Sequence, residues 1–584
     1  MMTHRNTTSI LLLVALLSLA IRTMAGDGRF IERPVTPQRV VWTSDATGTH
    51  VRQAEQLLQP FSGQVAVSDK HHCTLRSDST HTASILLDFG KEIHGGLKIF
   101  AGIRRSKKAA TLRITYGESV SEAMSRIGAD TKANATNDHA LRELIVQVPW
   151  LGSAMTGHSG FRFARIDLLD TDIDVNITAV QAISRMRDYD YEGTFECNDQ
   201  RLNDIFSTAA YTVHLNMQEY IWDGIKRDRL VWLGDLNPEI LTICNVFGQQ
   251  AFDLIHRSLD FGRDAYPLPA FINDMSSYSL WWIINQYDLY RYEGNLDYLR
   301  QQRSYLSGLV ERFAALIDST TGAEKIPGGF LDWATSENST AIHGGMQALA
   351  YIAMLRAAAM GTYLDDAALT QRANDVAALL AHHLPDTDNT QALSLLALSG
   401  LRKDTETVAQ QILHNGLTQI STFYGYYALE ALARAGRYND ALDIISTYWG
   451  KMLDLGATTF WEELTWNDVA NAARIDEPVP DGKFDIHADG GAYCYVGLRA
   501  SLCHGWASGP ATWLMQHVLG VMPLEPGCTK LSIAPHLGQL QWAKGTFPTP
   551  KGLVHIDVRR DAHGKQVVSV KAPKGIKIVE SKQK

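Results

Sequence analysis

The sequence predicts a multidomain protein in which an (α/α)6 toroid is flanked by an N-terminal β-sandwich and a small C-terminal β-domain. The chain has 584 residues, more than one hydrophobic core usually serves, so two or three domains are expected. Both ends of the chain show the alternation of strands, whereas the middle holds about twelve segments with helical spacing. Twelve helices in consecutive hairpins are typical of a toroid.

The first 25 residues have the pattern of an export signal. His4 and Arg5 precede an apolar run, Ile10–Ile21, and Ala25 suits the last position before cleavage. The run is too short to cross a bilayer, and no later stretch is long and apolar enough. We therefore expect a signal peptide over 1–25, no membrane anchor, and a secreted or periplasmic mature protein.

Residues 26–195 predict the β-sandwich. Segments such as "SILLDFGKEIHGGLKIF", "ATLRITYGES" and "GFRFARIDLLD" alternate apolar and polar residues, or run briefly apolar, between Gly, Asp and Ser breaks.

Residues 196–522 predict the helical domain, where stretches such as "DALDIISTYW" carry apolar residues at helical spacing. In a toroid the active site lies in loops at one end. The expected helices begin near Gln200, Pro238, Gln250, Ser277, Leu296, Ala341, Asp365, Thr390, Thr405, Thr422, Asn439 and Ser508. Residues 523–584 return to strands, as in "TKLSIAPHL" and "LVHIDVRR", and predict the C-terminal β-domain.

Composition excludes several classes of function. Apolar residues make up 45% and charged residues 20%, as in ordinary soluble proteins, and the net charge of -9 gives no basic footprint for nucleic acid. The six cysteines are scattered without a CxxC spacing, so no zinc site is expected. Their disulfide pattern stays open, with Cys494 and Cys503 as the nearest pair. No metal-binding run is present, and we expect no cofactor.

One stretch, "EYIWDGIKRDRLVWLGDLNPE", combines five acids and three bases with two tryptophans. A buried helix would not tolerate so many charges, and a solvated helix face would not need the tryptophans. The stretch falls between the first two expected helices, so it predicts a loop at one end of the toroid. Asp223, Asp228 and Asp235 are not spaced four residues apart, which suits a loop that directs several carboxylates inward. A solvated connector with incidental salt bridges is the alternative.

Three further loops combine tryptophan with ionisable residues: "LGATTFWEELTW", "GGFLDWATSEN" and "RASLCHGWASGP". The first lies in the long gap before the last expected helix, and insertions of that length are usually functional. Together the four loops predict one pocket of carboxylates set among aromatic rings. Plain packing of each tryptophan, and a structural hydrogen bond for the histidine, remain the alternatives. The residues concerned are Asp332, Trp333, Trp461, Glu462, Glu463, Trp466, His504 and Trp506.

Paired carboxylates in an aromatic pocket fit glycoside hydrolysis. One acid must be protonated to donate to the leaving oxygen, while the other must be ionised to activate water. A polysaccharide lyase on the same toroid is one rival, but it would need a base beside a charge-neutralising Arg, Asn or metal. A non-catalytic sugar-binding protein is the other, and it would have lost one of the two acids.

The first loop resembles the signature of the α-L-rhamnosidases of glycoside hydrolase family 78. "GATTFWE", "FLDW" and "SLCH" are similar to later motifs of that family, in the same order, and the resemblance covers nearly all of the mature chain. The chain departs from the family pattern at Gly224-Ile225, where many members have Cys-Pro, and at Arg229, where Glu or Gln is common. The matching residues of the first signature are Asp223, Arg227, Asp228, Trp232, Gly234 and Asp235.

The resemblance implies an inverting hydrolase that removes terminal rhamnose from a carbohydrate, with no metal. Asp228 would be the proton donor and Glu462, rather than Glu463, the general base. Because a nearby cation favours an ionised carboxylate, a donor at Asp228 requires Arg227 and Arg229 to point away from it. The implied sugar-binding residues are the acids Asp223, Asp235 and Asp332, the hydroxyl-binding or acid-orienting Arg227, the rings Trp232, Trp333 and Trp461, and His504.

Overall fold

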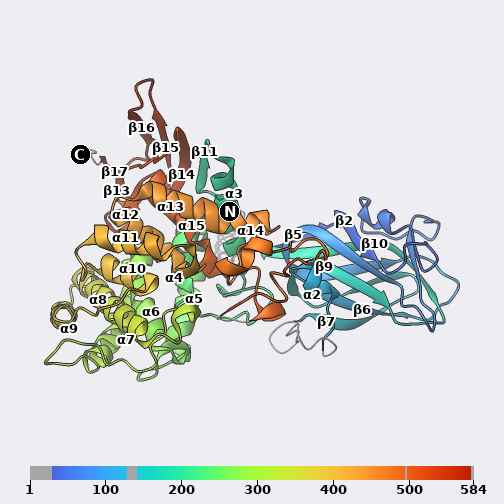
Figure 1. Cartoon of the computed structure of the whole chain (residues 1–584), viewed down its shortest axis with the longest axis horizontal. Coiled ribbons are helices and arrows are strands. Elements are labelled where there is room, and N and C mark those ends of the chain that lie inside the picture. Colours follow the sequence, from blue (N-terminus) through green and yellow to red (C-terminus); the bar gives the residue numbers. More distant parts are fainter. Residues whose placement is uncertain (1–28, 128–140, 493–495, 581–584) are drawn as a thin grey trace, which may run out of the picture.

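The computed structural model describes residues 29–127, 141–492 and 496–580, in three parts that follow one another along the chain (Figure 1). A sheet domain is followed by a large helical domain and then by two small sheets, so the predicted fold class is confirmed. The expected signal peptide and Cys494 lie outside the described residues. The five described cysteines form no disulfide with one another and are buried. Within the described ranges, no helix combines the length and apolar character needed to span a bilayer.

The N-terminal domain is built around one long strand of 18 residues, β5. Its first half pairs with β2 and β9 and its second half with β10 and β8, so it runs through the whole domain. Along β5, Ile85 and Leu87 face the main core while Leu86 packs on the other side with Phe163, as period-two alternation predicts. The strands are β1 (Phe30–Val35), β2 (Arg39–Thr43), β3 (Val51–Arg52), β4 (Cys73–Arg76), β5 (Ser84–Ala101), β6 (Ala110–Gly117), β7 (Glu143–Val148), β8 (Gly152–Met155), β9 (Ser159–Leu168) and β10 (Asp174–Arg187), with the short helix α2 (Val120–Met124) after β6.

The helical domain is a closed ring of six inner helices surrounded by outer helices. The ring closes because the last inner helix, α15, contacts both α4 and α12. The inner helices are α4 (Leu236–Val246), α6 (Ser276–Glu293), α8 (Ser339–Tyr363), α10 (Thr390–Ser399), α12 (Gly425–Arg434) and α15 (Gly509–Trp513), the last extended by a π-helical turn over Leu514–Val518. The outer helices are α3 (Gln200–Asn216), α5 (Phe252–Ala265), α7 (Leu296–Ala314), α9 (Ala367–Leu380), α11 (Thr405–Asn415) and the pair α13 (Tyr438–Ile444) and α14 (Gly450–Asp454), joined by the π-helical turn Ile445–Trp449.

The inner and outer helices differ in sequence because they are buried to different extents. Every residue of the inner helix α4 is buried, which suits a helix surrounded by others. The outer helix α9 buries only one stripe, Leu369, Ala373, Val376, Ala377 and Leu380, at the spacing of one helical face. All twelve expected helices are present, and each begins within three residues of the predicted position.

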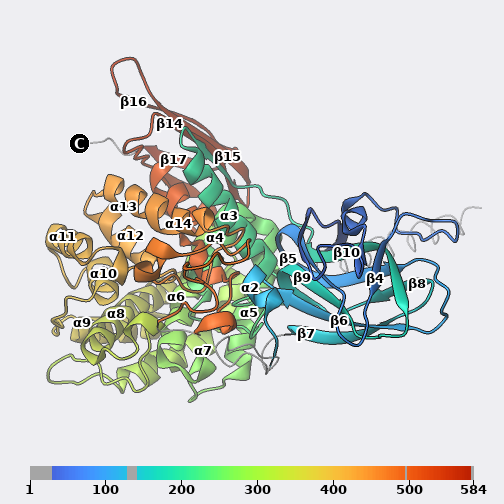
Figure 2. The same ribbon diagram turned by 45° about the vertical axis from the view of Figure 1, so that its right-hand side comes forward.

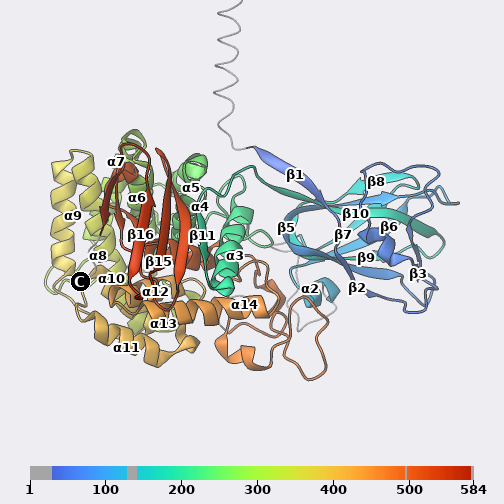
Figure 3. The same ribbon diagram turned by 90° about the horizontal axis from the view of Figure 1, so that it is seen from above.

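Two small sheets complete the chain and lie over the helical ring (Figure 3). The first strand of the larger sheet, β11, precedes α3. This sheet therefore combines residues that come before the toroid in the sequence with residues that come after it. The four-stranded sheet contains β11 (Thr194–Cys197), β14 (Trp542–Thr549), β15 (Gly552–Arg560) and β16 (Gln566–Lys571), and the three-stranded sheet contains β12 (Val521–Pro523), β13 (Lys530–Ile533) and β17 (Lys577–Glu580).

The connections that lead from an outer helix to the next inner helix all reach the same end of the ring, because consecutive helices alternate in direction. The longest of them spans residues 455–508, between α14 and α15. It packs against the N-terminal sheet domain, where Arg162 pairs with Asp476 and the Val120 N–H donates to the carbonyl of Ile475 (Figure 2). The N-terminal domain therefore sits beside the end of the toroid at which these connections meet.

Candidate active site

A pocket of about 190 Å³ lies at the end of the toroid where the inner helices begin. Helix N-termini present partial positive charge, which suits a site rich in carboxylates. Four connections contribute to it, those before α4, α6, α8 and α15. The lining residues are Asp223, Arg227, Asp228, Trp232, Asp235, Met275, Tyr278, Phe330, Trp333, Glu462, His504 and Trp506.

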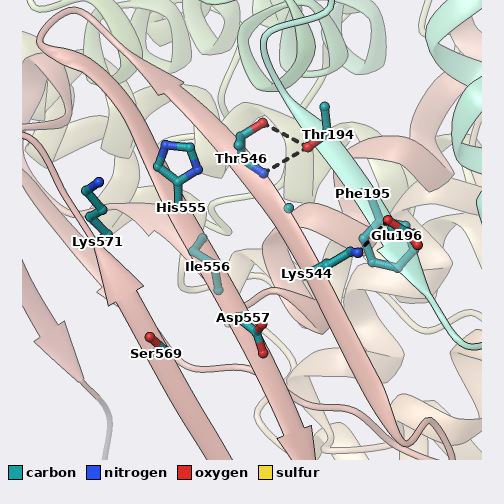
Figure 4. Close-up of a pocket in the computed structure, with 11 residues that line it drawn as sticks. Thr194, Phe195, Glu196, Lys544, Thr546, His555, Ile556, Asp557, Ser569 and Lys571 are labelled. Carbon is teal, nitrogen blue, oxygen red and sulfur yellow. Dashed lines mark hydrogen bonds and ion pairs between the residues drawn. The ribbon is translucent and has the colours of Figure 1, made fainter.

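A larger hollow of about 590 Å³ lies on the outer face of the C-terminal four-stranded sheet (Figure 4). It is shallow and is lined by strand residues that already pair with one another, such as Thr194 with Thr546 at 2.8 Å and Lys544 with Glu196 at 2.9 Å. None of the predicted site residues contributes to it. The smaller pocket, with its converging carboxylates, is therefore the candidate active site.

The connection before α4 is folded so that its acids face the pocket. Asp223 closes the loop, because its Oδ1 accepts the backbone N–H of Leu230 at 2.9 Å. Asp228 and Arg229 both adopt left-handed backbone angles, with φ of 54° and 55°. Residues other than glycine rarely adopt this conformation, which is found where the surrounding structure enforces it, often at functional sites.

Arg227 joins the two acids to which the sequence assigns the chemistry. Its Nη1 lies 2.8 Å from Asp228 Oδ2, and its Nη2 lies 2.7 and 2.8 Å from the two carboxylate oxygens of Glu462. Its Nε donates to the carbonyl of Arg499 at 2.9 Å. Since one planar guanidinium spans both acids, the two bound oxygens lie no more than about 8 Å apart.

The expectation that both flanking arginines point away from Asp228 is half wrong. Arg229 does point away, toward the carbonyl of His158 in the N-terminal domain at 3.3 Å. Arg227 instead forms an ion pair with Asp228, because the left-handed turn brings the carboxylate back over the preceding side chain. In the sugar-free site Asp228 is therefore in direct contact with a cation.

The side chains of Glu462 and Glu463 point in different directions and have different hydrogen-bond partners. Glu462 Oε2 accepts the backbone N–H of Ser501 at 2.8 Å in addition to the contacts with Arg227. Glu463 turns away from the pocket lining, since its Oε1 accepts hydrogen bonds from Thr465 Oγ1 at 2.6 Å and from the Ala492 N–H at 2.7 Å. Of the two acids, only Glu462 lines the pocket.

His504 lies between the two sides of the pocket. Its Nε2 is 3.9 Å from Asp223 Oδ2 and 4.0 Å from Glu462 Oε1. Burial lowers the pKa of His504 to about 4, so the ring is neutral at pH 7. Burial also raises the pKa of Asp223 well above its usual range, against the opposing effect of Arg227.

Two further acids are held by hydrogen bonds from neighbouring parts of the ring. Asp235, just before α4, accepts the Tyr278 hydroxyl at 2.6 Å, and burial raises its pKa to about 8. Asp332 accepts bonds from Gln391 Nε2 at 3.0 Å and Ser421 Oγ at 2.5 Å, and burial raises its pKa to about 6.

The structure brings eight of the ten predicted site residues together around one pocket. The other two, Asp332 and Trp461, are almost fully buried and are not part of its lining. Asp332 is held by its hydrogen bonds to Gln391 and Ser421. The eight residues in the lining are Asp223, Arg227, Asp228, Trp232, Asp235, Trp333, Glu462 and His504.

The sequence did not single out three lining residues, Met275, Tyr278 and Phe330. Met275 and Tyr278 lie at the start of α6 and carry no charge, so no chemical signal marked them. Trp506 was expected in the pocket, but its neighbour His504 was the residue assigned to sugar binding. Trp506 holds the backbone of Glu462, because its Nε1 donates a hydrogen bond to the Glu462 carbonyl at 3.0 Å.

Glu239 is a buried acid that the sequence did not single out. It lies four residues after Asp235 on α4, and burial raises its pKa well above the usual range. Its carboxyl lies directly against Gly505, where a Cβ atom would come within 2.0 Å of Glu239 Cδ. The residue after His504 must therefore be glycine for this packing.

The raised pKa of Asp235 predicts a change in the pH dependence of stability. A buried carboxyl with a pKa of about 8, compared with 3.8 normally, stabilises the fold fully below about pH 4 and loses this contribution as the pH rises toward 8. Asp235→Asn keeps a neutral group there at every pH. The melting temperature of the sugar-free variant, relative to wild type, should therefore rise between pH 5 and pH 8. The exposed control Asp386→Asn should show no such trend, and a constant difference for Asp235→Asn would contradict the assignment.

Comparison with known families identifies the class of protein. Residues 190–518 match the bacterial alpha-L-rhamnosidase 6 hairpin glycosidase domain, and residues 520–579 match the bacterial alpha-L-rhamnosidase C-terminal domain. The chain thus has the fold of a six-hairpin glycoside hydrolase. Within that class, the chain belongs to the bacterial α-L-rhamnosidase family. No curated protein matches the chain significantly.

Solved structures share the fold at low sequence identity. A family 78 rhamnosidase of Bacillus sp. GL1 is 20% identical, with a TM-score of 0.71, over 91% of this chain and 55% of that chain. A rhamnosidase from Klebsiella oxytoca with rhamnose bound is 20% identical, with a TM-score of 0.66, over 84% and 96%. The Streptomyces avermitilis α-L-rhamnosidase complexed with L-rhamnose is 17% identical, with a TM-score of 0.69, over 94% and 50%. The chain thus spans about half the length of two of these three proteins.

Proposed function

We propose that the protein is an inverting α-L-rhamnosidase that removes terminal rhamnose from glycosides or polysaccharides, with Asp228 as general acid and Glu462 as general base. The observation that carries the proposal is the pair of carboxylates joined by Arg227 in a pocket of about 190 Å³. A pocket of this size suits one sugar ring. The rhamnose in the Klebsiella oxytoca and Streptomyces avermitilis structures supports the choice of sugar.

The geometry supports a distinct role for each acid. In an inverting enzyme the carboxyl groups are about 6.5–9.5 Å apart, which leaves room for the attacking water. The limit of about 8 Å set by Arg227 is compatible with that spacing. Glu462, bound by Arg227 and the Ser501 N–H, would take the proton from water. Asp228 would protonate the leaving oxygen once sugar binding has drawn Arg227 away from it.

The remaining lining residues would bind the sugar. A pyranose has hydroxyls that carboxylates and His504 can bind, and C–H surface that rings such as Trp232 and Trp333 can cover. Trp333 is 37% exposed, which leaves its ring accessible at the pocket. Asp332 and Trp461 would act from behind the lining, by supporting the residues that touch the sugar. No step needs a metal ion or a cofactor.

We further propose that the mature protein is secreted or periplasmic, on the basis of the signal-like residues 1–25.

A screen of aryl glycosides tests the proposed activity, with the α-L-rhamnoside first. Cleavage of the rhamnoside in preference to other α-L- and β-D-glycosides is expected. Cleavage of another sugar, or release of an unsaturated product as in a lyase, would overturn the proposal.

The first test concerns the general acid. Asp228→Asn should lower kcat by about 10²–10⁴-fold on substrates with poor leaving groups, because these need protonation to depart. Activated aryl rhamnosides, whose leaving groups need little protonation, should lose far less. Steady-state kinetics on a leaving-group series measures the difference, with the fully exposed Asp386→Asn as control. Equal loss across the series would exclude a donor role for Asp228.

The second test concerns the general base and the stereochemistry. Glu462→Gln should abolish turnover while L-rhamnose still binds in calorimetry, and Glu463→Gln should be mild because that side chain turns away from the pocket lining. A reversed pattern would move the base by one residue. Proton NMR immediately after cleavage should show the β-anomer of rhamnose first. Initial release of the α-anomer would mean retention and would refute the inverting mechanism.

A further inference from the structure

A buried ionic cluster joins the N-terminal sheet domain to the loops of the active site. It contains Glu118 and Glu122, which flank the start of α2, and Lys226, the residue before Arg227. All three side chains are at least 98% buried. Lys226 Nζ lies 3.0 Å from Glu118 Oε2 and 3.2 Å from Glu122 Oε1.

The cluster contains side chains that are spaced like metal ligands, but the ammonium group of Lys226 already binds its two carboxylates. Glu118, Glu122 and His487 are, within the described ranges, the acids and histidine spaced closely enough to hold an ion. The ammonium group of Lys226 contacts both carboxylates, and it also donates to the carbonyls of Leu498 and Ala500 at 3.1 and 2.6 Å. Burial lowers the pKa of His487 to about 4, so this ring is neutral at pH 7.

The two carboxylates are fixed by the local structure of α2. Ser119 caps the helix, with its Oγ accepting the Glu122 N–H at 3.0 Å. Glu122 Oε2 accepts the N–H of Glu118 at 2.8 Å, and its Oε1 lies 3.2 Å from Arg142 Nε. With Arg142 the cluster brings two carboxyls and two cations together, and burial raises the pKa of Glu118 to about 7.

Glu118 reaches across the domain boundary and touches the active-site loop itself. Its Oε2 accepts the backbone N–H of Leu502 at 2.6 Å. The preceding N–H, of Ser501, donates to Glu462 at 2.8 Å, and His504 follows two residues after Leu502. Glu118 therefore binds the residue next to Ser501, and the N–H of Ser501 holds the proposed base, Glu462.

The same segment, residues 498–504, is held from the other side by the loop before α4. Lys226 binds the carbonyls of Leu498 and Ala500, while Arg227 binds the carbonyl of Arg499 at 2.9 Å. Segment 498–504 thus lies between the loop that carries Asp228 and the carboxylate of Glu118.

The sheet domain also approaches this loop too closely for any side chain. A Cβ atom at Gly160, in β9, would come within 2.7 Å of the backbone nitrogen of Lys226. The contact therefore joins the backbone of one domain to the backbone of the other. An interface of this kind fixes relative position more firmly than contacts between flexible side chains.

We propose that Glu118 is a positioning residue for the hydrolytic site, which holds segment 498–504 and Lys226 in the register that aligns Glu462 with Asp228. The proposal rests on the function proposed above. It makes the N-terminal sheet domain a working part of the catalytic unit and not a separate sugar-binding module. Because a misplacement of about 1 Å can cost about 10²-fold in rate, loss of this support should be visible in kcat.

The test compares Glu118→Gln with Glu122→Gln in the full chain. Each change replaces a fully buried carboxyl beside Lys226 with an amide, but of the two side chains it is Glu118 that accepts a hydrogen bond from segment 498–504. For Glu118→Gln, kcat on an aryl α-L-rhamnoside should fall by about 10–100-fold, with KM changed by less than about threefold. Glu122→Gln should keep kcat within about threefold of wild type. The stoichiometry of L-rhamnose binding in calorimetry should stay near one per chain, which shows that lost rate is not unfolded protein.

A second variant covers the case in which Glu118→Gln does not fold. Glu118→Asp keeps the charge for Lys226 but withdraws the carboxylate from Leu502, and it should still lose about tenfold in kcat. Unchanged kcat in the folded Glu118 variants, or equal loss in the Glu118 and Glu122 variants, would overturn the positioning role while the proposed function stands. A wild-type protein that cleaves no α-L-rhamnoside would overturn the proposed function, and the positioning role with it.

Discussion

The contact between Arg227 Nη2 and both carboxylate oxygens of Glu462 is the interaction on which the site depends. It joins the loop before the first inner helix to the loop before the last, at the point where the ring closes. The same guanidinium binds Asp228 and the backbone of Arg499, so one side chain sets the separation of both acids. A buried arginine suits this task, because its planar fork stays charged and fixes direction as well as distance.

Burial sets the protonation of the neighbouring acids, and at Asp223 it acts against Arg227. Asp223, Asp235 and Glu239 all lie in the same low-dielectric region, and burial raises the pKa of each. These three carboxyls can therefore remain neutral in the sugar-free site. A neutral carboxyl can donate as well as accept a hydrogen bond, which matches the hydroxyls of a sugar better than a field of like charges would.

The sequence could predict the toroid because burial leaves a direct record in the pattern of apolar residues. All twelve helices follow from it, as do the loops in which charge and aromatic residues coincide. The direction in which a side chain points produces no comparable pattern in the sequence. Asp332 is fixed by Gln391 and Ser421, which belong to α10 and the loop before α12, and Arg227 turns onto Asp228 because of a left-handed turn. The contact between Glu118 and Leu502 joins residues far apart in the chain, so no local pattern announces it.

The strand β11 has a consequence for how the protein is made. It precedes the first helix of the toroid, yet its partner in the sheet is β14, and Thr194 meets Thr546 across 352 positions of sequence. This pairing can form only when nearly the whole chain has left the ribosome. Until then the early inner helices, such as α4, every residue of which is buried in the folded protein, have no complete partner. Such long-range pairing is slow and leaves apolar surface open to aggregation. The last sixty or so residues thus complete the assembly, and damage to them should increase aggregation.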